Sequence, residues 1–509
     1  MTDPVPLDGR SLTLERFLSV VRGRAPVSVA SEALAAVRTS RAAVERAVES
    51  GQAVYGVSTG FGGLSSVTIP PEKVRELQIS LVRSHACGTG APLPTEVVRG
   101  LMLLRLNSLA RGLSGVRPEL LDRLAEFLNR GLVPWVPEQG SVGASGDLAP
   151  LAHLALAIVG EGRFWDPAAA TPVPADVVLG RERLAPLRLE AKEGVALLNG
   201  TALMASYLAL AVADARGLLE AATIAGAMSV DALEGSPESF DDRLGEARNA
   251  PDERAVAASL RALLEGSELA AVRARWSGQD PYTLRCLPQV LGAVHGALRF
   301  AEATVGRELN AVTDNPLVLG PGEFVSGGNF HGQSLAFALD ALALAAQYLA
   351  GFSERRIARL VHPGLNRGLP AFLAPEPGVT SGYMVPQYVA AALVNENSVL
   401  VHPASASSLP TSADQEDFVS MGAWAGAKLA RILDNTRRVV AIEWLVAGSA
   451  LEHRRPRAGG RGSVAALRAL RERCRPYEAD RSLTDDVARI AEGILRGELV
   501  QAVRAEVPY

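Results

Sequence analysis

Cysteine is scarce in this chain. The three cysteines, Cys87, Cys286 and Cys474, are odd in number and widely spaced, and none belongs to a Cys-x-x-Cys pair. Such a pattern supports neither a disulfide framework nor a zinc cluster, and it suits a reducing compartment. We therefore expect a cytoplasmic protein without a bound metal.

An excess of one charge is lacking as well. The formal net charge is -4 over 509 residues, and no dense block of lysine and arginine occurs. This excludes the basic field that nucleic acid or an anionic membrane surface requires. The first ten residues lack the basic and then apolar build of a secretory signal. The most apolar stretches, 202–212 and 335–352, are interrupted or flanked by charges, so we expect buried helices and no membrane partner. A small molecule is the partner that remains.

Aromatic residues are few, at 5% of the chain against 48% hydrophobic residues, so the core must be aliphatic. Apolar residues recur at helical spacing over 14–49, and segment 98–131 has the pattern of two helices. Segment 164–189, rich in proline and alanine, predicts a surface excursion. Long Ala/Leu-rich helical patterns cover residues 200–233, 289–309, 332–360, 390–400 and 423–451. Their length predicts a bundle of long helices joined by polar connectors.

The tripeptide Ala144-Ser145-Gly146 stands out for its chemistry. It lies in a run of small residues, 139–153, just before a predicted helix. If the nitrogen of Gly146 attacks the carbonyl carbon of Ala144, a five-membered ring closes as the carbonyl oxygen leaves in one water, and loss of a second water from Ser145 leaves an exocyclic methylidene. By itself the tripeptide is more simply a turn that caps a helix. It does not match the Gly-x-Ser-x-Gly elbow of serine hydrolases.

The wider sequence resembles the histidine and phenylalanine ammonia-lyase family along almost the whole chain. Seven motifs in the expected order carry the resemblance: residues 55–62, 139–153, 198–201, 279–286, 313–316, 326–332 and 415–417. The resemblance implies that residues 144–146 cyclise autocatalytically to 4-methylidene-imidazol-5-one (MIO), and that no external cofactor is needed. It reverses the simpler interpretation of the tripeptide as a turn.

The resemblance also implies an architecture. The expected fold is mainly α, of the ammonia-lyase/fumarase-like superfamily, with a bundle of long central helices and a smaller N-terminal part that carries the MIO loop. We expect the division at residues 1–200 and 201–509, packed intimately as one unit. Family members are homotetramers whose sites combine residues from several chains.

Individual residues take roles from the family. Tyr55 matches the base that removes the β-proton, once the substrate amine has added to the electrophile. Arg285 matches the carboxylate clamp, since a guanidinium fork can grip a carboxylate with two hydrogen bonds. Asn199 and Tyr282 match residues that hydrogen-bond the ring of the electrophile, and Phe330 matches the aromatic side chain packed against it.

The expected substrate depends on residues that face its side chain. The pair at 84–85 is Ser-His, which is typical of histidine lyases, whereas tyrosine lyases have His-Leu and plant-like phenylalanine lyases have Phe-Leu. His85 and Glu416 can pair with the two nitrogens of an imidazole; a phenyl ring would leave both unpaired, at about 1–3 kcal/mol each. Gln279 completes the expected substrate contacts. The resemblance thus implies elimination of ammonia from L-histidine to trans-urocanate, a step of histidine catabolism.

Three departures from the histidine lyases leave alternatives open. Ser58 replaces their usual asparagine, Phe418 replaces a histidine, and segment 243–254 lacks a histidine-rich run. A phenylalanine or tyrosine ammonia-lyase, or a 2,3-aminomutase, would need the same electrophile. A catalytically silent helical scaffold is the alternative from a different class. Retention of Tyr55, Ser145 and Arg285 together speaks against a scaffold.

Overall fold

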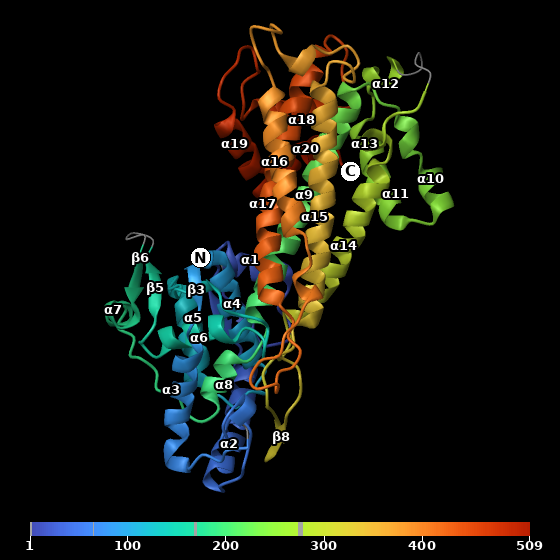
Figure 1. Cartoon of the computed structure of the whole chain (residues 1–509). Helices are drawn as coiled ribbons and strands as arrows, with labels where there is room; N and C mark the ends of the chain where they lie inside the picture. The colour runs from blue at the N-terminus through green and yellow to red at the C-terminus, as the bar shows by residue number, and fades with distance from the viewer. Residues whose placement is uncertain (1–2, 65, 167–170, 273–277) are drawn as a thin grey trace. The chain divides into compact units, whose positions relative to one another are not determined.

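The structure is a computed structural model (Figure 1) that describes residues 3–64, 66–166, 171–272 and 278–509. Helices dominate these residues, and the strands among them form only two-stranded pairs. This confirms the predicted mainly α fold. Contacts divide the chain into two compact units; four of the five boundaries fall inside long helices, and the fifth, between His402 and Pro403, falls in a loop. The division of the sequence at residue 200 stays a prediction.

The first unit comprises Met1–Leu210, Glu302–Asp340 and Pro403–Ala427. Its helices are α1 (Leu14–Val21), α2 (Ser31–Glu49), α3 (Val74–His85), α4 (Thr95–Ala110), α5 (Pro118–Arg130), α6 (Leu148–Ile158), α7 (Ala175–Arg181) and α8 (Glu193–Leu198). Its strands pair as β1 (Val5–Leu7) parallel to β2 (Val27–Val29), and as antiparallel β3 (Thr89–Pro92) with β4 (Pro137–Gln139), β5 (Arg163–Asp166) with β6 (Thr171–Pro174), and β7 (Leu317–Gly320) with β8 (Glu323–Val325).

The second unit comprises Ala211–Ala301, Ala341–His402 and Lys428–Tyr509. It contains α10 (Asp242–Arg248), α11 (Pro251–Leu263), α12 (Glu268–Val272), α13 (Tyr282–Arg285), α16 (Met384–Leu400), α18 (Arg461–Arg471), α19 (Thr484–Leu495) and α20 (Glu498–Glu506). The helices that cross the unit boundaries are α9 (Ala202–Ala232), α14 (Leu287–Glu308), α15 (Gln333–Val361) and α17 (Gly422–His453).

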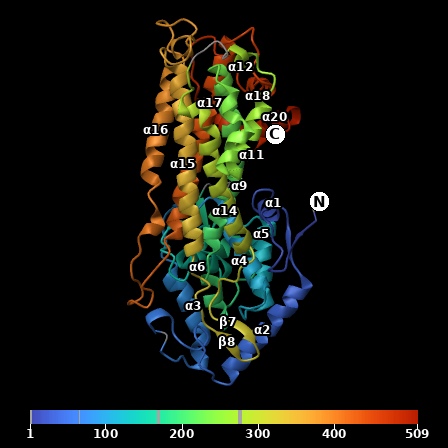
Figure 2. The ribbon, with the colours of Figure 1, turned by 90° about the vertical axis from the view of Figure 1, so that its right-hand side faces the viewer.

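The long helices of the second unit run side by side in both views (Figures 1 and 2). The indole nitrogen of Trp444 on α17 donates to the carbonyl of Ala221 on α9 at 3.0 Å, and the buried Arg356 and Glu443 join α15 to α17. Among the described residues, α9 and α15 are long and apolar enough to cross a membrane, yet 78% and 61% of their most apolar windows are buried. Such burial is typical of core helices.

Candidate active site

The Ala144-Ser145-Gly146 tripeptide forms a tight turn between β4 and α6. The φ angles of Ser145 and Gly146 are +50° and +84°, and the Gly146 N–H donates to the carbonyl of Gly143 at 3.3 Å. A Cβ atom on Gly146 would lie 2.1 Å from the carbonyl oxygen of Gly200. The nitrogen that would close the ring therefore belongs to a position that admits only glycine. These residues fit the formation of MIO.

The neighbouring segment 199–201 holds this turn on both sides. The N–H of Gly200 donates to the carbonyl of Ser145 at 3.1 Å, and the N–H of Asp147 donates to the carbonyl of Gly200 at 2.8 Å. The buried Asp147 carboxyl accepts the N–H groups of Leu203 and Met204 in the first turn of α9, at 2.8 and 3.2 Å. Burial outweighs these hydrogen bonds and raises the pKa of Asp147 to about 7.

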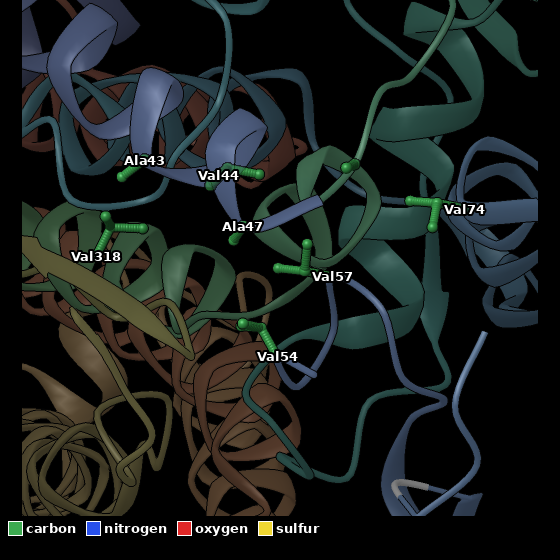
Figure 3. Packing of buried hydrophobic residues seen from close by; sticks show 8 residues of the cluster. Ala43, Val44, Ala47, Val54, Val57, Val74 and Val318 are labelled. Atoms are coloured by element: carbon green, nitrogen blue, oxygen red, sulfur yellow. The ribbon is translucent and has the colours of Figure 1, made fainter. Parts of the chain in front are cut away.

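Tyr55 lies in a loop that is anchored by the aliphatic side chains on either side of it. Val54 and Val57 are buried in a cluster (Figure 3). The other buried members of this cluster are Ala43, Val44, Ala47, Val74, Ala191 and Val318. The Tyr55 hydroxyl accepts the N–H of Gly62 at 3.3 Å, and its ring meets Phe61 edge-on at 6.2 Å. The loop thus holds a half-buried phenol whose oxygen already faces a backbone donor.

Ser58, the first departure from the histidine lyases, stabilises the same loop through its side chain. Its hydroxyl accepts the N–H of Val54 at 3.0 Å and donates to the carbonyl of Gln52 at 2.7 Å. Both hydrogen bonds of this hydroxyl stay inside the loop, so Ser58 helps to fix the position of Tyr55.

Glu416 lies beside Ser145. The Ser145 hydroxyl donates to Glu416 Oε1 at 3.4 Å, and the Thr411 hydroxyl donates to Oε2 at 3.0 Å. The same loop reaches the Tyr55 loop, because the N–H of Gly63 donates to the hydroxyl of Ser412 at 3.1 Å. Three segments that are distant in sequence therefore meet around residue 145.

Asn199 is held both through its side-chain amide and through its backbone carbonyl. Its Nδ2 donates to the carbonyl of Asn315 at 2.9 Å, and its own backbone carbonyl accepts the guanidinium of Arg105. Phe330, half-buried, lies in the loop between β8 and α15. Both residues belong to the first unit, as does Ser145.

Phe418, the second departure, is 58% exposed. Its ring stacks on His331 with centroids 6.2 Å apart, and its carbonyl lies 3.1 Å from His331 Nε2. The side chain at this position therefore supports the residue that follows Phe330.

His85 is the last residue of α3, and its Nδ1 faces the carbonyl of Leu81 at 2.8 Å. A backbone carbonyl can only accept, so Nδ1 is the donor in this contact, and the Ser84 hydroxyl lies 3.0 Å from the same nitrogen. Among the described residues, His85 and Glu416 share no hydrogen bond. The pairing of both side chains with one imidazole stays a prediction.

Gln279, Tyr282 and Arg285 belong to the second unit. Tyr282 begins the short helix α13, and the guanidinium of Arg285 lies 4.8 Å from the centre of its ring. A cavity of about 600 Å³ is lined by Gln279, Arg285 and Asp280, and an ion pair of Asp280 with Arg367 at 2.6 Å braces this connector. Within the part of the chain that the structure describes, the buried Nε of Arg285 has no hydrogen-bond partner. This N–H group can therefore donate a hydrogen bond to an anion.

Segment 243–254, the third departure, covers most of α10, the turn that follows it and the first residues of α11. Asn249 ends α10 in the left-handed conformation, at φ +55°, and Pro251 is the first residue of α11. Both residue types suit these positions. An ion pair of Arg254 with Asp242, at 2.6 Å, joins the two helices.

Sequence reasoning missed three charged residues of the first unit. Lys192 and Asp314 form a fully buried ion pair, and Arg105 is buried next to Asn199. Asp314 lies inside a recognised motif, which was the only signal. Lysine and arginine are usually exposed, so nothing in the pattern indicated their burial.

Known proteins are similar in sequence to this chain over most of its length. The family model described as "Aromatic amino acid lyase" matches residues 12–472. A histidine ammonia-lyase of Anaeromyxobacter sp. (strain K) is 49% identical over 97% of this chain and 99% of the relative. One from Geobacillus thermodenitrificans is also 49% identical, over 88% of this chain and 89% of the relative.

Solved structures agree with the sequence relatives. A tyrosine aminomutase from Streptomyces globisporus superposes with a TM-score of 0.94 at 37% identity, covering 100% of this chain and 99% of that one. A histidine ammonia-lyase from Trypanosoma cruzi has a TM-score of 0.92 at 38% identity, covering 99% and 96%. The fold is thus the helical fold of carbon–nitrogen lyases and aminomutases. The chain belongs to the aromatic amino acid lyase family, as the motifs predicted.

Proposed function

We propose that this enzyme eliminates ammonia from L-histidine to give trans-urocanate, using MIO formed from Ala144, Ser145 and Gly146 without an external cofactor. The observation that carries the proposal is the turn at Gly146, closed where no side chain fits, with the carboxylate of Glu416 3.4 Å from the Ser145 hydroxyl. The curated relatives at 49% identity are named histidine ammonia-lyases, which supports the choice of substrate.

Once formed, MIO supplies an electrophile that turns the substrate amine into a leaving group. The protein's own side chains provide the rest. Tyr55 takes the β-proton, and the N–H of Gly62 stabilises the negative charge that then develops on the phenol oxygen. Arg285 grips the substrate carboxylate with its unpaired Nε–H. Asn199 and Tyr282 donate to the ring, and Phe330 packs against it.

Selection of histidine is assigned to His85 and Glu416, with Gln279 as a further contact. The Nε2 of His85 accepts from one imidazole nitrogen, while Glu416 pairs with the other. An aromatic ring without nitrogen would leave two polar groups unpaired. A tyrosine aminomutase superposes as well as any lyase described above, so a 2,3-aminomutase, or a phenylalanine or tyrosine lyase, is the second candidate.

The proposed assembly is a cytoplasmic homotetramer whose sites combine chains. Gln279, Tyr282 and Arg285 would then reach the turn at Ser145 from another copy. Support comes from exposed apolar side chains on α15 and α16, which suit a covered helix face. These are Phe337, Leu344, Tyr348, Val385, Tyr388, Val389 and Val399.

Intact-mass measurement tests the electrophile. The mature chain is expected to weigh two waters less than its sequence, whereas a chain of full mass would identify a silent scaffold. Incubation with L-histidine, L-phenylalanine and L-tyrosine separately tests the substrate, because each product is a conjugated acrylate that absorbs in the ultraviolet. If only cinnamate or coumarate appears, the histidine assignment is wrong.

A further inference from the structure

A buried ion pair is connected to segment 199–201, which holds the turn at Ser145. Lys192 Nζ is 2.7 Å from Asp314 Oδ2, and both side chains are 0% exposed. Burial lowers the pKa of Lys192, against the attraction of Asp314. Removing two charges from water is costly, and apolar residues often stabilise such a position as well or better. This pair is therefore poorly explained by stability alone.

The pair connects to Asn199 through the backbone of one residue, Asn315. Asp314 Oδ1 accepts the N–H of Asn315 at 2.7 Å, and the carbonyl of Asn315 accepts Nδ2 of Asn199 at 2.9 Å. The side chain of Asn315 is fixed too, because its Oδ1 accepts the N–H of Gly327 at 2.8 Å. Asp314 thus fixes the carbonyl that determines which way the amide of Asn199 points.

Arg105 holds the backbone of the same segment. It is fully buried, and it donates to the carbonyl of Asn199 and to the hydroxyl of Ser108 at 3.1 Å. A Cβ atom on Gly200 would lie 2.6 Å from the guanidinium and 2.5 Å from the hydroxyl of Thr313. Arg105 and Thr313 therefore pack so closely on position 200 that only glycine fits there.

We propose that Lys192, Asp314 and Arg105 are positioning residues that fix Asn199 and Gly200 against the turn at Ser145. In that position Gly200 holds the turn through its two backbone hydrogen bonds, and the amide of Asn199 is aimed at the ring that forms there. This inference rests on the proposed function. Its prediction is that loss of the ion pair impairs cyclisation or turnover beyond any loss of stability.

The test uses Lys192→Met, Asp314→Asn and the double variant, which removes both charges of the pair. Intact mass gives the fraction of chains that lack two waters, and steady-state kinetics give kcat and KM. We expect each single variant to lose about 100-fold in kcat per folded chain, with KM changed little, because small displacements of catalytic groups have effects of this size. The double variant is expected to regain thermal stability without regaining kcat.

Arg117→Met is the matched control. Arg117 pairs at 2.8 Å with Glu193, whose side chain is 0% exposed and which directly follows Lys192. The control should lose stability and keep both kcat and the mass deficit. If the double variant recovers kcat, or if the control loses as much kcat, the positioning role is refuted. If Lys192→Met does not fold, Asp314→Asn decides, because its single amide oxygen cannot accept both from Lys192 and from the N–H of Asn315. A wild-type chain of full mass would instead refute the proposed function itself.

Discussion

At the scale of single residues, Asp147 links the turn to α9, and its protonation should be visible in stability. Its ordinary pKa of 3.8 is raised to about 7 by burial. Between these values the folded chain binds a proton that the unfolded chain has released, so stability falls as pH rises from about 4 through about 7. Asp147→Asn should remove this part of the dependence, because asparagine stays neutral and can still accept an N–H of α9.

Thermal unfolding of both proteins at pH 5 and pH 8 measures this effect. The wild type should lose more stability than Asp147→Asn between the two pH values. Parallel losses would show that Asp147 is ionised throughout, with its charge satisfied by the N–H groups of Leu203 and Met204.

Gly146→Ala tests the steric argument. The added methyl group would meet the carbonyl of Gly200 at 2.1 Å, and φ +84° disfavours alanine by about 1–3 kcal/mol. We expect a folded but less stable chain of full mass. Gly131→Ala is the control, since Gly131 has φ +68° and open space where the Cβ would be. It should lose stability and keep the mass deficit, whereas a cyclised Gly146→Ala chain would contradict the argument.

At this scale the sequence predicts the residues that take part in the reaction better than the buried residues that hold them in place. The tripeptide carries its reaction in its residue types, and the motifs predict Glu416 as a substrate contact, whose Oε1 lies 3.4 Å from the Ser145 hydroxyl. Lys192 and Arg105 act over separations of 122 and 94 residues. No local period encodes such contacts, and both residue types usually indicate surface.

At the scale of elements, helices with sustained apolar periodicity are the predictable part. The pattern at 423–451 became α17 (Gly422–His453), and that at 289–309 became α14 (Leu287–Glu308). Segment 164–189 was predicted only as a surface excursion, with no elements assigned to it. It forms β5, β6 and α7, with Phe164 packed edge-on against Phe127 at 5.1 Å. Strands of four residues are too short for a period-two signal, and β6 also contains Pro172 and Pro174.

Helix α13 has four residues and is likewise too short to be predicted from periodicity. It contains Arg285, the subject of the prediction at this scale. Arg285→Ala should raise KM by about 10–100-fold, the worth of a charged hydrogen bond, with a smaller effect on kcat. Arg285→Lys should restore little, because a point charge cannot reproduce the guanidinium fork. Steady-state kinetics with L-histidine measure both variants. An unchanged KM in Arg285→Ala would show that the carboxylate is bound elsewhere.

At the scale of the whole molecule, the site residues are divided between the two units of the chain. Tyr55, Ser145, Asn199 and Glu416 belong to the first unit, and Arg285 belongs to the second. If sites combine subunits as proposed, then a chain defective in one unit can complement a chain defective in the other. This consequence is independent of how much activity either set of residues contributes.

Co-expression of Ser145→Ala with Arg285→Ala tests this division. At substrate concentrations below the raised KM, Ser145→Ala alone should be inactive and Arg285→Ala alone only weakly active. Random mixing in a tetramer would leave about a quarter of the sites with both residues intact, and these sites should have the wild-type KM. The control pair is Ser145→Ala with Glu416→Ala, because the contact between these two side chains lies within one chain and no mixed site can contain both. Activity in the first mixture and none in the second would show that Arg285 arrives from another subunit. Equal inactivity of both mixtures would place the complete site within a single chain.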